Sequence, residues 1–146
     1  MSDEFDRDLG HCKRELDAAR EELLGVVTAL KDGDLDRGRR GGWPVRRVLE
    51  HVIWSELLYS RLITHLRGGT PEGETPPSTP SSAADALERL EGSHEALLAA
   101  FDGVDEESFY RLGTIGHEEY SIISVLENEI NHEREHAEQV RAIVNG

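Results

Sequence analysis

The chain has 146 residues, which is the size of one ordinary domain built around one hydrophobic core. Its 16 Lys and Arg residues against 30 Asp and Glu residues give a formal net charge of −14, and such a surface repels nucleic-acid phosphates and anionic lipid headgroups. The single cysteine, Cys12, excludes an intrachain disulfide and a thiolate-rich zinc site.

The first predicted helix covers about residues 4–30. Apolar residues recur there at steps of three and four, which places them on one face of a helix. These residues are Phe5, Leu9, Cys12, Leu16, Ala19, Leu23, Val27 and Leu30. Because Cys12 lies on this face, we expect a small core residue rather than a nucleophile. Residues 31–42 are polar and rich in glycine, which predicts a loop.

The second predicted helix begins at Pro44 and ends near Arg67. Proline suits a first helical turn, where its missing N–H costs nothing. Residues 68–80, GGTPEGETPPSTP, contain too much proline and glycine for a helix or a central strand. This segment can span on the order of 40 Å when extended, and a helix of about 23 residues is roughly 35 Å long. The segment is therefore predicted to be a crossover that lets the second and third helices point the same way.

The remaining predicted elements are also helical. A third helix begins near Ser81 or Ser82, which are good capping residues. Residues 105–112 are expected to form a short extra helix, and a last helix is expected to run from near Ser121 almost to the end. No strand alternation longer than a few residues appears. The expected fold is an all-α four-helix bundle, with residues 1–146 forming a single domain.

The last helix contains the pentapeptide HEREH, which has the H-E-x-x-H spacing of zinc proteases. A spacing of four places His132 and His136 on one helix face, close enough to bind one ion. A catalytic zinc site needs a third protein ligand. The ten residues after His136 supply no His, Asp or Cys. The third ligand must therefore come from another helix.

His51 is the best candidate for this third ligand. When the second helix is projected at about 100° per residue, His51 falls at the edge of the apolar face. His132 and His136 fall at the corresponding edge of the last helix. Three imidazoles from two helices can meet there and hold Zn²⁺, Ni²⁺ or Fe²⁺, and the spacing does not select among these ions.

Two runs resemble a known family. GWPVRRVLEHV resembles the second helix of the DinB/YfiT-like, DNA-damage-inducible helical family, in which a tryptophan precedes the helix and a histidine follows some eight residues later. NHEREHAEQVRAI resembles the last helix of that family, with its H-x-x-x-H pair followed by a glutamine. One departure is Pro44, where the family more often has Ser or Thr, which changes the cap and not the ligands.

The resemblance implies a fold and a metal site. The fold is a four-helix bundle with up-down-down-up topology and a long crossover between helices 2 and 3. The site is a divalent metal held by His51, His132 and His136. Related proteins include thiol-dependent transferases and isomerases, which implies a metal-dependent enzyme acting as an S-transferase with a low-molecular-weight thiol cofactor. Zinc and nickel are the ions most expected, followed by iron.

Two alternatives stay open. In the first, the chain is a metal-dependent hydrolase in which Glu133 is the base that activates water. In the second, it is a non-enzymatic, stress-related metal-binding helical module. Glu133 and Glu129 can also support the ligands from outside the coordination sphere, and Glu129 can serve as a fourth ligand.

Other residues have structural explanations. His94 lies on the apolar face of the third helix, which predicts a hydrogen-bonded core histidine. His11 is expected to face solvent. Trp43 and Trp54 are expected to be packing residues, with Trp54 also able to line the cleft.

The expected compartment is a bacterial-type cytoplasm. The chain opens with the acidic run MSDEFDRDLG instead of a basic and apolar leader. Its apolar runs, such as LLGVVTAL, are far shorter than the roughly 20 residues that cross a bilayer. The expected partners are a small-molecule substrate and, because related bundles are often dimers, a second copy of the chain in a homodimer.

Overall fold

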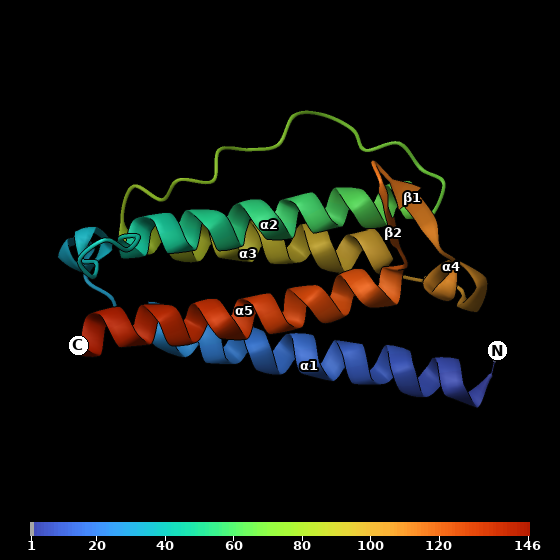
Figure 1. The fold of residues 1–146 in the computed structure, drawn as a ribbon, viewed down its shortest axis with the longest axis horizontal. Helices are drawn as coiled ribbons and strands as arrows, with labels where there is room; N and C mark the ends of the chain where they lie inside the picture. The colour runs from blue at the N-terminus through green and yellow to red at the C-terminus, as the bar shows by residue number, and fades with distance from the viewer. Residues whose placement is uncertain (1) are drawn as a thin grey trace.

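Four long helices dominate the structure, a computed structural model that describes residues 2–146 (Figure 1). They are α1 (Asp3–Val27), α2 (Val45–Leu66), α3 (Ala83–Phe101) and α5 (Ile122–Asn145). In Figure 1, α2 and α3 run in one direction, and α1 and α5 run in the opposite direction. The crossover between α2 and α3 passes back along the length of the bundle. The predicted four-helix bundle with up-down-down-up topology is confirmed.

Serine side chains begin three of these helices, because each hydroxyl accepts a backbone N–H that the helix itself leaves unpaired. Ser2 caps α1, Ser82 caps α3 and Ser121 caps α5. The helix starts predicted at Ser82 and Ser121 are therefore confirmed.

Two predicted boundaries are wrong by a few residues. α1 ends at Val27, where a tighter bond from the Leu30 N–H to the Val27 carbonyl closes the last turn. Leu30 is still buried, because the chain turns its side chain back onto the core. Pro44 precedes α2 in an extended conformation, since residues 38 and 44 form an isolated bridge there.

Short elements complete the connections. The 3₁₀ helix η1 (Asp32–Asp36) lies in the predicted loop between α1 and α2. Helix α4 (Glu106–Tyr110) confirms the predicted short helix. Strands β1 (Gly113–Ile115) and β2 (Glu118–Tyr120) form an antiparallel hairpin that the sequence did not predict, because three residues are too few for a visible alternation. The hairpin turn contains Gly116, whose φ of 65° suits glycine.

Apolar side chains fill the bundle in two clusters, one toward each end. The first cluster includes Leu23, Val52, Leu90 and Ala137, and the second includes Ala19, Ile63, Leu97 and Ile130. Buried polar side chains from all four long helices form a layer, whose members are Arg20, Glu56, Ser93, Glu129 and Glu133. All of them except Glu129 lie between members of the two clusters in sequence. In residues 2–146, no helix combines the length and hydrophobicity needed to cross a membrane.

Candidate metal centre

Three histidines meet between α2 and α5. The Nε2 atom of His132 lies 3.1 Å from that of His51 and 2.8 Å from that of His136. Nitrogen atoms of all three rings lie within 4.8 Å of one another. The spacing of four puts His132 and His136 on one face of α5, and the packing of α2 against α5 brings His51 to the same place. The structure therefore brings together the three histidines singled out from the sequence.

The surroundings favour neutral imidazoles, which is the form that binds metal ions. Burial, together with the neighbouring His136 and His51, lowers the pKa of His132 to about 4. Burial, His136 and Arg47 also lower the pKa of His51. At neutral pH, both rings therefore carry a lone pair.

Gln139 orients the third ring. Its Oε1 lies 2.8 Å from Nδ1 of His136. Because an amide oxygen only accepts hydrogen bonds, Nδ1 must carry the proton and Nε2 must be the free acceptor. Together with its two neighbours, His136 forms a donor set of three imidazoles that fits Zn²⁺, Ni²⁺ or Fe²⁺.

A cavity of about 480 Å³ opens on the His51 side of this cluster. Its walls include Trp43 and Trp54, whose rings flank that of His51 at centroid distances of 5.4 Å and 6.2 Å. The guanidinium of Arg47 lies 4.8 Å from the centre of the Trp43 ring and also lines the cavity. Residues 75–79 of the crossover form the opposite wall.

Trp43 and Trp54 are wall residues rather than core packing residues. Their exposed fractions are 39% and 50%, respectively, which corrects the packing role expected for them. The expectation that Trp54 lines the cleft agrees with its place in the cavity wall. Their amphipathic rings are suited to contact a ligand that is partly apolar.

A second cluster of acidic residues lies inside the bundle. Oxygen atoms of Glu56, Glu129 and Glu133 lie within 4.8 Å of one another, and all three residues are buried. Arg20 donates two hydrogen bonds of 2.7 Å from one nitrogen to Glu56 and a third, of 2.5 Å, from Nε to Glu133. The guanidinium therefore already occupies the cation position among these carboxylates.

The three carboxyl groups have different protonation preferences. Burial and the charges of Glu56 and Glu133 raise the pKa of Glu129 well above its usual value. Burial also raises the pKa of Glu133, although Arg20 opposes that rise. Burial alone would raise the pKa of Glu56, but hydrogen bonds from His94 and Ser93 and the charge of Arg20 hold it below the usual value. Of the three carboxyl groups, Glu129 is thus the one whose surroundings most favour the protonated form.

Glu133 lies in this inner cluster and not among the histidines, although it follows His132 directly in sequence. One residue along a helix corresponds to a rotation of about 100°, which turns Glu133 toward the core. Its Oε1 accepts the bond from Arg20. The role of water-activating base proposed for Glu133 stays a prediction that this position does not favour.

Residues 15–140 match the sequence model of the DinB superfamily, which covers well over half of the chain. The chain belongs to the DinB superfamily. The DinB-like protein of Bacillus cereus ATCC 10987 superposes on it with a TM-score of 0.74 at 19% identity, over 92% of this chain and 89% of that one. The four-helix bundle protein TT2238 superposes with a TM-score of 0.70 at 20% identity, over 90% and 96% of the two chains. These similarities show a shared fold, and no curated protein matches the chain.

Two members of the inner cluster of this DinB superfamily protein, Arg20 and Glu56, were not predicted from the sequence. Arg20 lies four residues after Leu16 and three before Leu23, and Glu56 lies in the gap between Val52 and Tyr59. Charged residues at apolar positions of a helix are a signal for buried ion pairs. His94 meets its expectation as a hydrogen-bonded histidine, because its Nδ1 lies 3.1 Å from Glu56.

Proposed function

We propose that this protein is a metal-dependent enzyme in which His51, His132 and His136 hold a divalent ion. The observation that carries the proposal is the meeting of three imidazole nitrogens from two helices within 4.8 Å of one another. Zinc and nickel suit such a donor set best, and iron is also compatible with it. Three protein ligands leave coordination positions for a substrate.

The proposed reaction is S-transfer from a low-molecular-weight thiol to a small electrophile. A divalent ion at the site supplies a lowered pKa for a coordinated thiol and polarisation of a carbonyl. The residues of the chain have separate tasks. Trp43 and Trp54 contact the apolar part of the substrate, and Arg47 binds an anionic group of it. Gln139 holds His136 in the tautomer that leaves Nε2 free.

The hydrolase alternative has less support than S-transfer. It needs Glu133 to reach a water molecule beside the histidines. The carboxyl group of Glu133 is instead completely buried and bonded to Arg20. Under this proposal, the H-E-x-x-H spacing reflects two metal ligands, His132 and His136, on one face of α5, and a core residue, Glu133, between them.

Metal binding is tested on protein purified without chelator and without a nickel column. The metal content is measured by mass spectrometry, and the affinity for Zn²⁺ and Ni²⁺ by calorimetric titration of protein freed of metal. We expect one ion per chain, and a loss of affinity of at least about 100-fold in His51→Ala. His65→Ala, an exposed histidine on the same helix, is the matched control and keeps the affinity. Equal affinities in both variants contradict the metal site.

The reaction is tested with Glu133→Gln. An S-transferase keeps most of its activity toward a panel of low-molecular-weight thiols and a chromogenic electrophile, whereas a hydrolase loses activity by orders of magnitude. Melting curves of the variant show whether the fold is retained. If the protein binds metal as expected but catalyses neither S-transfer nor hydrolysis, the result favours the non-enzymatic module. This test does not address three further predictions, which are the stress-related role, the cytoplasmic location and the homodimer.

A further inference from the structure

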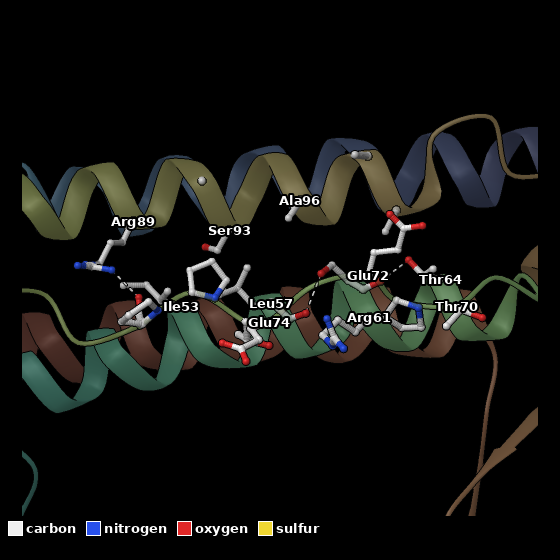
Figure 2. Close-up of a pocket in the computed structure, with 18 residues that line it drawn as sticks. Ile53, Leu57, Arg61, Thr64, Thr70, Glu72, Glu74, Arg89, Ser93 and Ala96 are labelled. Carbon is white, nitrogen blue, oxygen red and sulfur yellow. Dashed lines mark hydrogen bonds between the residues drawn. The ribbon is translucent and has the colours of Figure 1, made fainter.

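A second cavity, larger than the one beside His51, lies between α2, α3 and the crossover. Its volume is about 590 Å³, which is in the usual range for small-molecule sites. Figure 2 shows Ile53, Leu57, Arg61 and Thr64 of α2 on one side of it and side chains of α3 on the other. The histidine cluster is not part of its wall.

The floor of the cavity consists of small side chains on α3. They are Gly92, Ser93, Ala96, Ala99 and Ala100. A Cβ atom added at Gly92 would meet no atom within 4 Å. The space exists because α3 contributes small residues over most of this face, with Arg89 at one end, and the aliphatic chains of Ile53 and Leu57 make the opposite wall apolar.

The crossover forms the roof, and arginine side chains attach it to the helices. Arg61 donates to the carbonyl of Gly73, and Arg89 donates to that of Pro77. Both arginines line the cavity. The roof is therefore held over the cavity by hydrogen bonds from side chains to backbone oxygens.

The two arginines differ in how their charges are compensated. Arg89 forms an ion pair with Asp85 at 2.8 Å. In residues 2–146, the hydrogen bond found for Arg61 is the one to Gly73, at 3.3 Å, and no carboxylate lies within 4.0 Å of it. A hydrogen bond from a charged donor to an anion is about twice as strong as one between neutral groups. Arg61 thus offers a guanidinium without a direct carboxylate partner in the lining of this cavity.

The cavity continues toward the histidines along one face of α2. Residues 75–77 line both this cavity and the one beside His51. On α2, the lining positions 47, 50, 54, 57, 61 and 64 follow one another at steps of three and four, which places them on one helix face. Arg61 lies ten residues after His51, or about 15 Å along the helix axis.

We propose that this cavity binds an amphipathic carboxylate, such as a medium-chain fatty acid, with its carboxylate at Arg61 and its chain over the small side chains of α3. Charge complementarity at Arg61 and the apolar lining carry the proposal. The exposed Glu72 and Glu74 also line the cavity, on either side of the Gly73 carbonyl that Arg61 binds, so a cationic probe is the competing ligand. The proposal does not depend on a metal at the histidines.

The test compares three probes that share one alkyl chain, namely decanoate, decanol and decylammonium. Their binding to the full-length protein is measured by calorimetric titration. We expect one decanoate per chain and weaker binding of the other two probes. Arg61→Gln weakens decanoate binding about tenfold and leaves decanol unchanged, because only the charged bond is lost. Arg7→Gln, an exposed arginine of α1, is the matched control and changes neither.

A second variant tests where the alkyl chain of the ligand binds. Ala96→Phe fills the floor and abolishes the binding of both decanoate and decanol, while melting curves verify the fold. Three results would overturn the proposal. They are decanoate binding that survives Ala96→Phe, decanoate binding that is unchanged in Arg61→Gln, and decanoate binding that is weaker than decylammonium binding. His51→Ala binds decanoate like the unaltered protein, so a failure of the metal site and a failure of this cavity are observed separately.

Discussion

At the level of single residues, Glu129 is held in the middle of the bundle under conditions that favour its protonated form. Glu129 is 1% exposed, and within residues 2–146 neither of its carboxyl oxygens has a hydrogen-bond partner. A proton on Glu129 removes its negative charge from a site that already holds Glu56 and Glu133. The charged form would instead place a third negative charge beside Glu56 and Glu133, with Arg20 as the neighbouring cation.

Replacing Glu129 with Gln should change how stability depends on pH. Because the pKa of Glu129 is raised in the folded state, its stabilising contribution is complete below the pKa of the unfolded chain and is lost as pH rises through the folded value. Gln imitates the protonated group at every pH. We therefore expect the melting temperature of Glu129→Gln, relative to the unaltered protein, to rise between pH 5 and pH 9 in metal-free protein. A difference that stays constant over this range contradicts the assignment.

Replacing Arg20 with Met should destabilise the fold by about 3–5 kcal/mol, because Glu56 and Glu133 then remain buried without a cation. The free energy of unfolding is measured by urea denaturation at neutral pH. The exposed Arg7→Met is the matched control and should change it by less than about 0.5 kcal/mol. Replacing Arg20, Glu56 and Glu133 together with apolar residues should recover most of the loss. A single variant as stable as the control contradicts the role of Arg20.

At the level of elements, the helices follow from local patterns. α5 begins where Ser121 and Ser124 exchange hydrogen bonds between their side chains and backbone N–H groups. Ser121→Ala should lower the free energy of unfolding by about 1 kcal/mol, because an N–H of the first turn loses its acceptor. Ser78→Ala in the crossover is the control and should have little effect. Equal effects of the two substitutions in urea denaturation contradict the capping role.

Periodicity predicted the helices and the histidine cluster well for a common reason. A regular helix fixes the face of each residue, so the positions of His51, His132 and His136 relative to the apolar stripes are readable from the sequence. The length of residues 68–80 likewise predicted the direction of α3. The hairpin at 113–120 was missed, because each strand is too short to establish a pattern.

The inner cluster shows what the sequence could not supply. An apolar stripe identifies which face is buried, but it does not predict which charged residues interrupt that face or which partners they find. Arg20 and Glu56 are 36 positions apart in sequence and meet only through packing of different helices. For the same reason, the adjacency of Glu133 to His132 in the sequence suggests a base at the metal, although Glu133 points about 100° away from His132 around the helix.

At the level of the whole molecule, a charged layer separates two apolar clusters, and the histidines lie near the surface beside one of them. A metal that binds only the folded state should stabilise the entire bundle by about 2.7 kcal/mol at a free concentration of 100 times the dissociation constant. We expect Zn²⁺ to raise the melting temperature of the unaltered protein and excess chelator to reverse the change. An equal rise in His51→Ala contradicts binding at the histidines.

Whether α2 and α5 together hold one ion is best measured in a crystal structure of protein never exposed to chelator or to a nickel column. Anomalous diffraction on both sides of the metal absorption edges identifies the ion. We expect one anomalous peak about 2.0–2.1 Å from Nε2 of His51, His132 and His136 if the ion is zinc. A peak in the inner cluster of Glu56, Glu129 and Glu133, or a metal-free structure in which His51 lies apart from the other two rings, would contradict this expectation.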